Sequence, residues 1–370
     1  LLSILNMALL SKPKTDKRLF GQWPLLMNVD MGKTSFGMND TLMRLLGEEG
    51  KHLVVNHEMT LGVKSAYNIH DLTLGRISPT DQQYGLIVRQ MAVMLCGIDK
   101  SNHLKNEELV PMIKRMVKEV YAYYSPENEP KMYDPADDHK SLNPVFKKLG
   151  ITPDESQSYF ELTYEIMSKS KGKMAMAASY CQRFAVPLLE DYTLVLGNTP
   201  SLSAKYKEAS LPNGESMLGF FTSRLGDLLS EYRCFNTPTK LEIDKARVIS
   251  IDINNVCAGD EQRKAIFTGL CFAIYRLKSE SVEMSPDLFD GVDEVFLPNL
   301  QRSSAINFAL PSVCNVEEAH TFMTLFDHEL CEFMRKNRKE GWGLRSFSQR
   351  ITDPSDTFLS LCSSVYITSD

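Results

Sequence analysis

The sequence predicts an α/β fold, in which a mostly parallel sheet is flanked by helices and interrupted by a large all-helical insertion. Continuous apolar runs at 25–30 and 247–252 each end in an aspartate. Such runs are typical of parallel strands that helices cover on both faces. Strand and helix patterns alternate within residues 1–100, which favours a doubly wound sheet. Residues 101–235 instead carry apolar residues at helical spacing, with no convincing strand.

The same patterns predict individual elements in three successive parts of the chain. In 1–100 we expect strands at 25–30 and 51–56 and helices at 1–10, 40–46 and 81–95. In 101–235 we expect helices at 106–124, 156–169, 174–184 and 217–232. In 236–370 we expect strands at 247–252, 309–314, 343–348 and 364–368 and helices at 262–277 and 326–339.

Composition limits the possible functions. With 370 residues, 43% hydrophobic and 24% charged, the chain has an ordinary globular composition and room for two or more folding units. No apolar run approaches the ~20 residues of a membrane span, so we predict no integral membrane segment. The net charge of −6 argues against nucleic acid as the main partner, although a ring can concentrate positive charge in its pore. The eight scattered cysteines suit buried free thiols in a reducing cytoplasm.

Gly32-Lys33-Thr34 looks like the end of a phosphate-binding loop but lacks the first glycine of that motif. The pattern G-x-x-x-x-G-K-[ST] would place this glycine at Met27, which lies inside the apolar run. Because no loop separates the strand from the GKT sequence, we expect these backbone N–H groups to be tied up in a sheet rather than to surround a phosphate. We interpret the stretch as a strand that ends at Asp30 and is followed by a turn. Asp30 is therefore expected at the carboxyl edge of the sheet, where open α/β sheets bind ligands.

Two adjacent acids, Glu317 and Glu318, follow an apolar run and are the strongest candidates for catalysis. A nucleotide hydrolase needs one carboxylate in the Mg²⁺ shell and a second that orients and deprotonates the attacking water. The alternative is a pair of solvated acids at a helix start, where the helix dipole favours them. Asp252 also ends a strand and is a rival for the Mg²⁺ role, but no Glu follows it. We interpret His320 as a capping or supporting residue.

The segment after these acids offers a sensor and several cations. A strand that runs into Gln349, next after the paired acids, has the position of a γ-phosphate sensor in RecA-like ATPases, although such a Gln can also satisfy loop hydrogen bonds. The cationic run 335–339 suits a solvated helix C-terminus. In a ring, an arginine of this run could instead reach a neighbour's nucleotide as an arginine finger.

Short motifs that run along the whole chain in a fixed order resemble one known family. They lie at 28–32, 35–37, 67–76, 117–121, 164–167, 182–191, 247–256, 317–320 and 348–350. Together they resemble the IcmB/DotO ATPases of type IVB secretion and, equally, their conjugative-plasmid counterpart TraU. Two departures are Glu317, where the family usually has Asp, and the run Asp252-Ile-Asn-Asn-Val256, where the family has an acidic "DLDEV".

The resemblance implies a RecA-like P-loop core at 1–100 and 236–370, with the insertion at 101–235 between the two parts. Since the family's P-loop precedes the helix that begins here at Leu1, it also implies a C-terminal fragment. ATP and Mg²⁺ are the implied cofactors, with Glu317 in the Mg²⁺ shell, Glu318 as catalytic base and Gln349 as sensor. Asp30 and Asp252 are expected beside the nucleotide. The arginine finger from a neighbouring subunit is expected among Arg335, Arg338 and Arg350.

The implied function is a hexameric cytoplasmic motor at the inner-membrane face of a secretion channel. Its implied partners are a second secretion ATPase, channel components and substrate adaptors or a coupling complex, and the cargo is protein in secretion or DNA in conjugation. A catalytically weak ring that recruits a second ATPase or adaptors is the alternative. A third possibility, a DNA translocase, requires a basic pore, and the sequence has no dense basic stripe beyond 335–339.

Overall fold

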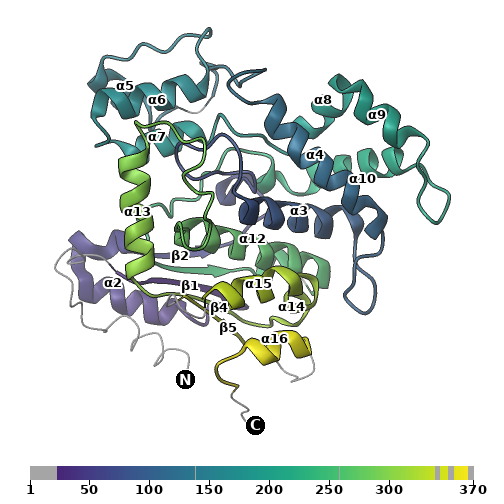
Figure 1. Ribbon diagram of the computed structural model, residues 1–370. Coiled ribbons are helices and arrows are strands. Elements are labelled where there is room, and N and C mark those ends of the chain that lie inside the picture. Colours follow the sequence, from purple (N-terminus) through teal and green to yellow (C-terminus); the bar gives the residue numbers. More distant parts are fainter. Residues whose placement is uncertain (1–22, 138, 258, 338–341, 349–353, 366–370) are drawn as a thin grey trace.

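The computed structural model describes residues 23–137, 139–257, 259–337, 342–348 and 354–365. It confirms the predicted fold class, because these residues form a parallel five-stranded sheet flanked by helices (Figure 1). The strand order is β2-β3-β1-β4-β5, with β1 at the centre. The strands are β1 (Leu25–Asp30), β2 (Val54–Glu58), β3 (Val248–Asp252), β4 (Ser312–Val316) and β5 (Trp342–Ser346).

The helices fall into three groups along the chain. Helix α2 (Phe36–Gly50) follows β1, and helix α3 (Asp81–Cys96) follows β2. Between β2 and β3 follow α4 (Val110–Tyr123), α5 (Asn143–Leu149), α6 (Tyr159–Ser170), α7 (Ala175–Gln182), α8 (Asp191–Asn198), α9 (Pro200–Lys207) and α10 (Met217–Glu231). After β3 come α11 (Asn254–Cys257), α12 (Glu261–Ser279), α13 (Leu297–Ala309), α14 (His320–Leu325), α15 (Asp327–Asn337) and α16 (Asp356–Leu361).

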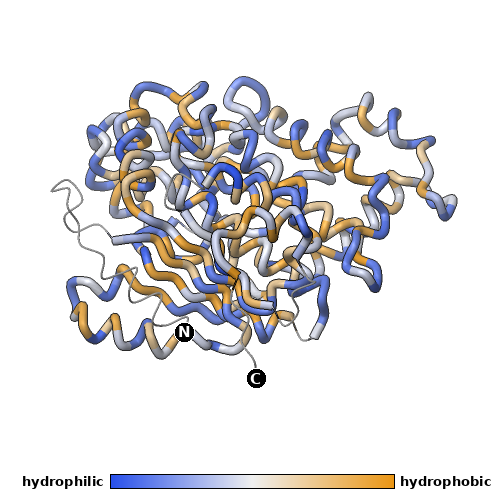
Figure 2. Tube along the Cα trace, turned by 60° about the horizontal axis from the view of Figure 1, so that its bottom comes forward, coloured by the Kyte–Doolittle hydropathy of each residue, from blue (hydrophilic) through white to orange (hydrophobic). Residues whose placement is uncertain are grey.

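Helices cover both faces of the sheet. Side chains alternate along a strand, so that Leu25, Met27 and Val29 join the large core on the side of α12, while Leu26 packs with Leu42 of α2 on the other side. Hydrophobic residues therefore dominate the strands, as Figure 2 shows along the sheet. This two-sided burial is the physical reason why the apolar runs at 25–30 and 247–252 are continuous.

Helices α4, α8 and α10 share one hydrophobic core with the sheet, whereas α5, α6 and α7 form a second hydrophobic cluster. Core residues such as Val120 of α4, Val195 of α8 and Leu225 of α10 belong to the same buried cluster as Ile249 of β3. Helix α3 lies between α12, which packs on the sheet, and the helices α4 and α10, because it contacts all three. No strand occurs at 101–235 among the residues that the structure describes, as predicted. The boundaries at 100 and 235 remain predictions.

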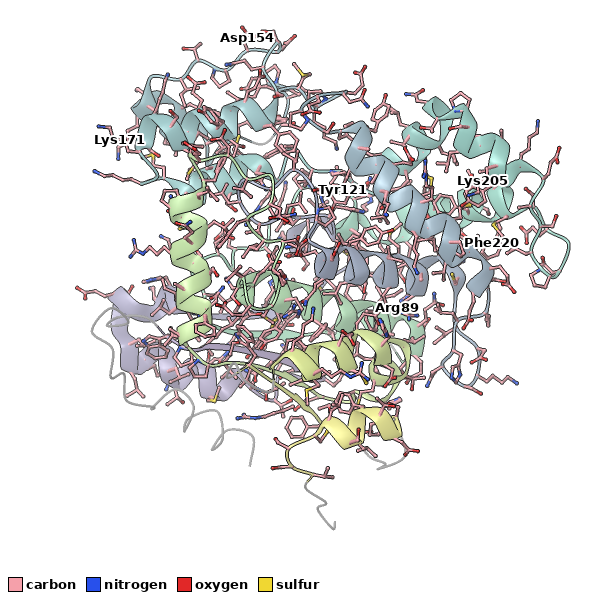
Figure 3. All side chains as sticks on the ribbon, viewed as in Figure 1. Arg89, Tyr121, Asp154, Lys171, Lys205 and Phe220 are labelled. Carbon is pink, nitrogen blue, oxygen red and sulfur yellow. The ribbon has the colours of Figure 1, made fainter. Side chains whose placement is uncertain are left out.

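A local signal in the sequence fixes the start of α3, and an ion pair connects the helix to α15. Thr80 accepts a hydrogen bond from the Gln83 amide, and the Gln83 side chain accepts one from the Thr80 amide, which makes a capping box. The predicted helix 81–95 therefore begins where expected. Further along α3, Arg89, which is labelled in Figure 3, forms an ion pair with Glu329 of α15 (Nε–Oε1 3.3 Å).

Several expected elements differ from the observed ones. Lys51–Leu53 forms a 3₁₀ turn, so β2 begins and ends later than predicted, and the predicted helix 40–46 extends to Phe36–Gly50. The strand expected at 309–314 begins at Ser312, because Ala309 ends α13. Residues 364 and 365 of the strand expected at 364–368 are not in a strand, and 366–368 lie outside the described residues.

Helices α5, α8, α9, α11, α13, α14 and α16 were not predicted. All of them except α13 have eight residues or fewer, too few for a helical period to stand out. In α13, only Leu300 and Ser304 are buried. A largely exposed helix has no strong apolar stripe in its sequence.

Gly269→Ala is expected to destabilise the fold, because α12 and α3 approach closely at this position. A Cβ at Gly269 would lie 2.4 Å from Gln90 Oε1 and from Phe326 Cζ. Overpacking costs ~1–3 kcal/mol, which outweighs the ~1 kcal/mol by which Ala favours a helix over Gly. Urea unfolding should therefore give a lower free energy of unfolding. As the matched control, Gly85→Ala in α3 has no described atom within 4 Å and should be neutral or stabilising. Equal stability of Gly269→Ala and the wild type would contradict this account.

Candidate functional site

Four acidic side chains lie in one row at the carboxyl edge of the sheet. The strand register pairs Asp30 with Asp252, and Asp252 with Glu58. Glu317 completes the row, because its amide donates to Val29 O and continues the β1–β4 ladder. Neighbouring strands are ~4.8 Å apart, so each acid has another beside it. We call Glu58, Asp252, Asp30 and Glu317 the carboxylate row.

A second row of polar side chains lies two residues earlier on the same strands. Asn28 donates to Ser250 Oγ (2.9 Å) and accepts from Asn315 Nδ2 (2.7 Å). Asn39 of α2 donates to Ser250 Oγ (2.8 Å) and to Asn56 Oδ1 (2.7 Å). Because buried polar groups are costly unless they are paired, this network favours one strand register and one position of α2. The register in turn keeps the carboxylate row in line.

The turn that follows β1 supplies partners to Glu58 at the end of β2 and to Asp252 at the end of β3. Lys33 Nζ pairs with Glu58 Oε1 at 2.6 Å, and the Gly32 amide donates to Asp252 Oδ1 at 3.0 Å. Gly32 has a φ of 113° and Lys33 a φ of 66°, both in the left-handed region. A side chain at Gly32 would be strained there, which explains the glycine.

The same turn also supplies hydrogen-bond donors to Asp30 at the end of β1 and to Glu317 directly after β4. Glu317 Oε2 accepts from the Met31 amide (3.1 Å) and from Thr34 Oγ1 (2.7 Å). Asp30 Oδ2 accepts from the Ser35 amide (3.0 Å) and from Ser35 Oγ (2.6 Å). Residues 31–35 thus contact all four carboxylates of the row.

This arrangement corrects the physical reason given for the GKT sequence. Its amides were predicted to pair within the sheet, but the Gly32 amide, and those of the flanking Met31 and Ser35, donate instead to carboxylates. A phosphate cradle needs several backbone N–H groups that converge on one anion. Here each of these three amides already has an anionic partner within the protein. The interpretation of a strand followed by a turn, without a phosphate loop, agrees with this geometry.

Asp30 is the most deeply buried member of the carboxylate row. Its Oδ1 atom has no hydrogen-bond partner among the described residues. Burial raises the pKa of Asp30 to about 6; the hydrogen bonds from Ser35 oppose the rise, and the nearby Glu317 and Asp252 add to it. Near neutral pH this side chain is therefore close to the point at which it gains a proton.

Glu318 leaves the row and turns toward a histidine. It has a φ of 50°, uncommon for a residue other than glycine, so the chain bends directly after Glu317. Glu318 Oε2 lies 4.0 Å from His320 Nδ1, and the Glu318 side chain is 35% exposed. The opposite ring nitrogen, Nε2, is 3.0 Å from Glu261 Oε2 at the start of α12. The two adjacent acids therefore have different environments.

The position of these groups follows from the topology. The connection after β1 leads to β2 on one side of the sheet, and the connection after β4 leads to β5 on the other side. Open α/β sheets bind ligands at such a switch point, in the crevice beyond the carboxyl ends of the strands. The turn at 31–35 and Glu317-Glu318 lie on the two sides of this crevice.

The donor set at this edge fits Mg²⁺ in one particular mode. Carboxylate and hydroxyl oxygens, such as those of Glu317 and Thr34, are hard ligands. Within the described part of the chain, no three His, Cys, Asp or Glu residues form a group that could hold a metal ion. Mg²⁺ commonly takes only one or two protein carboxylates and completes its shell with water and substrate phosphates. Glu317 and Thr34 fit that mode.

The remaining predicted residues are not at the carboxylate row. Arg335 is in the last turn of α15, at the end that leads back to the start of β5, and pairs with Glu332 (Nη1–Oε1 2.7 Å). It therefore lies toward the opposite edge of the sheet. Gln349, Arg338 and Arg350 lie outside the described residues.

Sequence reasoning missed Glu58 and Glu261. The strand predicted at 51–56 stopped two residues before Glu58, although an acid at a strand end was the signal already used for Asp30 and Asp252. Glu261 lies one residue before the predicted helix 262–277. No local signal connects it with His320.

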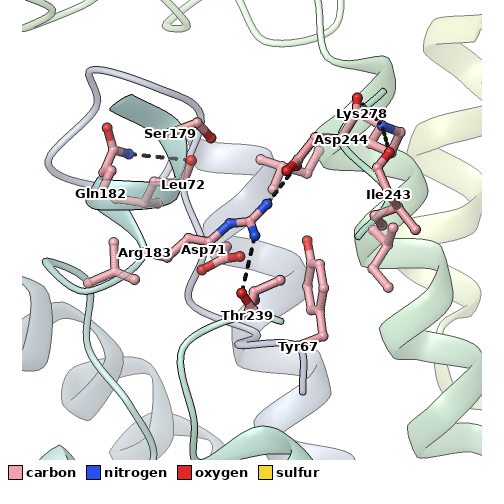
Figure 4. A pocket seen from close by; sticks show the side chains of 13 residues that line it. Tyr67, Asp71, Leu72, Ser179, Gln182, Arg183, Thr239, Ile243, Asp244 and Lys278 are labelled. Atoms are coloured by element: carbon pink, nitrogen blue, oxygen red, sulfur yellow. Dashed lines mark hydrogen bonds and ion pairs between the residues drawn. The ribbon is translucent and has the colours of Figure 1, made fainter. Parts of the chain in front are cut away.

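A cavity of about 70 Å³ lies near the other end of α12 (Figure 4). Arg183 in its wall pairs with Asp244 (2.6 Å) and donates to Thr239 O, while Lys278 donates to Ile243 O (2.7 Å). Burial raises the pKa of Asp71 in the same wall to about 6. From Glu261 to Lys278 the helix rises roughly 25 Å, so this cavity is remote from the carboxylate row.

Two motifs that carry the family resemblance meet near this cavity. The Asn68 side chain donates to Pro187 O (2.7 Å), and Gln182 Oε1 accepts from the Gly75 amide (2.7 Å). Segments 67–76 and 182–191 therefore bind each other. Their residues connect α7 to the loop before α3, which is a structural role.

Comparisons with known proteins give similarity to solved structures only. No protein-family model matches the chain, and no curated protein matches it significantly. The structure is similar to that of VirB4 of Thermoanaerobacter pseudethanolicus, with 13% identity, a TM-score of 0.42, and coverage of 91% of this chain and 73% of that chain. Among the described helices, none combines the length and apolar character needed to cross a membrane.

Asp30→Asn is expected to stabilise the protein at pH 8 and to have little effect at pH 4.5. A raised pKa means that the protonated form of Asp30 stabilises the fold. This contribution is fully present below the ordinary pKa of 3.8 and is lost as the pH rises through about 6. The loss is roughly 3 kcal/mol, at ~1.4 kcal/mol per pKa unit. Asn is neutral throughout. The free energy of unfolding at the two pH values tests this.

The matched control for Asp30→Asn is Glu58→Gln, which removes a half-exposed member of the same row. It should show no comparable difference between the two pH values. Equal destabilisation by Asp30→Asn at both pH values would show that the charge of Asp30 does not oppose folding.

Proposed function

We propose that this chain is the C-terminal ATPase region of a motor for type IVB secretion or plasmid conjugation. The observation that carries the proposal is the divergence of Glu317 and Glu318 at the switch point of the sheet. Glu317 joins the carboxylate row, whereas Glu318 turns out of it toward His320. A nucleotide hydrolase needs two such acids with different environments. The ordered motifs of the IcmB/DotO and TraU family supply independent support.

The geometry suggests how the two acids divide the work. Glu317 and Thr34 hold Mg²⁺, which when bound neutralises charge on the phosphate oxygens of ATP. Glu318 orients the attacking water and accepts its proton, a role that suits a partly exposed carboxylate. Asp30 and Asp252 keep the 31–35 turn in place beside the nucleotide, and Gln349 senses the γ-phosphate. The phosphate-binding amides come from the P-loop that the family resemblance places before Leu1.

The assembled motor is proposed to be a hexamer that binds ATP between subunits at the cytoplasmic mouth of the channel. In such a ring, a cation from one subunit reaches the nucleotide of the next. Arg335 is a candidate because it lies away from the carboxylate row of its own subunit. Arg338 and Arg350 are the other two. The proposed partners are a second secretion ATPase, channel components and substrate adaptors.

One observation favours a second candidate, a ring that recruits other proteins and hydrolyses little ATP. Three amides of the 31–35 turn, those of Met31, Gly32 and Ser35, already bind carboxylates. If no other part of the protein supplied such donors, the site would hold nucleotide weakly. Turnover by the complete protein distinguishes the two candidates.

Glu318→Gln is expected to abolish hydrolysis while leaving ATP binding intact. A catalytic base contributes ~10²–10⁴-fold to a rate, and Gln keeps the shape of Glu without its basicity. Turnover and nucleotide affinity should be measured on the complete protein, including the segment before Leu1. Glu127→Gln, at an exposed position in the loop after α4, is the control and should behave as wild type. Undiminished turnover in Glu318→Gln would remove Glu318 as the catalytic base, whereas negligible turnover by the wild-type complete protein would leave the recruiting ring.

A further inference from the structure

A chain of three side chains connects the start of α12 to the proposed catalytic base. Glu261 Oε2 lies 3.0 Å from His320 Nε2, and His320 Nδ1 faces Glu318 Oε2 at 4.0 Å. His320 is 29% exposed and lies between two carboxylates that come from different parts of the sequence. We propose, on the basis of the function proposed above, that Glu261 is a positioning residue that acts on Glu318 through His320.

Several contacts hold Glu261 in place. Lys264 Nζ lies 3.1 Å from Glu261 Oε1, and Thr321 Oγ1 donates to Glu261 Oε2. Thr321 is adjacent to His320 and fully buried, so one carboxylate binds two successive residues at the start of α14. Such a carboxylate has little freedom to turn away from the imidazole.

The two helices that carry this chain are packed against each other. Phe322 of α14 and Phe272 of α12 are both about 1% exposed and form an edge-to-face contact with ring centroids 5.6 Å apart. Rotation of α14 would break this contact along with the hydrogen bonds of Glu261. The position of His320 therefore depends on α12.

The imidazole of His320 presents one ring nitrogen to each acid, Nε2 to Glu261 and Nδ1 to Glu318. An ionised carboxylate only accepts hydrogen bonds, so each contact is favourable only while the nitrogen that faces it carries a proton. The ion pair with Glu261 orients the ring toward Glu318. Carboxylates behind a metal-binding histidine orient the imidazole in the same way, and their loss typically costs ~10–100-fold in metal affinity or activity, which sets the scale expected here. The main-chain bend at Glu318 provides the other constraint on the same side chain.

A purely structural role for Glu261 makes a different prediction. An acid in the first turn of α12 also interacts favourably with the helix dipole. In that case Glu261→Ala would lower stability without a selective effect on kcat. The two roles therefore differ in their kinetic consequences.

The test is a double-mutant cycle in the complete protein. Glu261→Ala and His320→Ala should each lower kcat by ~10–100-fold with an unchanged KM for ATP. The double variant should lose no more than either single one, because Glu261 acts through His320. Glu261→Gln keeps an acceptor for Nε2–H and should retain most of the activity.

Glu231→Ala is the control. It removes the ion-pair partner of Arg263, which lies in the same turn of α12 as Glu261, and it leaves the contacts of His320 intact. Additive losses in the cycle, a wild-type kcat in Glu261→Ala, or a rise in KM equal to the fall in kcat would overturn the inference. The series includes Glu318→Gln. If that variant is inactive and Glu261→Ala is fully active, only this inference fails. If Glu318→Gln is fully active, the proposed base is wrong, and if the wild-type complete protein does not hydrolyse ATP, the proposed function fails.

Discussion

Electrostatic repulsion among four strand-end carboxylates is the constraint on which this edge of the sheet depends. At a strand spacing of ~5 Å and an effective dielectric constant near 20, each neighbouring pair of charges would cost roughly 3 kcal/mol. The turn at 31–35 offsets this cost, since its amides, hydroxyls and one ammonium group contact every member of the row. The row, the turn and the start of α2 therefore form one unit, and a change in any member is felt by the others.

The fold could be predicted from the sequence where the physical signal was local. Continuous apolar runs identified β1 and β3, and the helical pattern at 81–95 identified α3, whose start the structure shows to be a capping box of Thr80 and Gln83. The strand order could not be predicted, because it depends on pairings such as Asp30 with Asp252 that lie 222 residues apart. For the same reason, Asp30, Asp252 and Glu317 were predicted as separate candidates. The row that they form with Glu58 emerged only from the register.

The GKT sequence illustrates how one pattern can serve a different purpose. Gly32 and Lys33 both adopt left-handed backbone conformations, as residues in a phosphate loop often need to do. Here this geometry directs amides and the Lys33 ammonium at the protein's own acids. A motif search sees only residue types, whereas the function of such a turn depends on whether the anion that it binds is a ligand or a neighbouring strand. The missing glycine at Met27 and the lack of a loop between the strand and Gly32 were the local signs of the difference.

The two ends of α12 show why burial alone does not identify a site. At its far end, Arg183 and Lys278 bind main-chain carbonyl groups and Asp244, so the two cations in the wall of the cavity there are already paired. At its near end, Glu261 binds a histidine that faces a partly exposed acid at the switch point of the sheet. A polar network that ends within the fold stabilises it, whereas one that ends at an accessible carboxylate can also orient that carboxylate for chemistry. Glu318 is the point at which the network of α12 reaches the crevice, and this distinguishes it from Glu317, whose hydrogen bonds hold the turn.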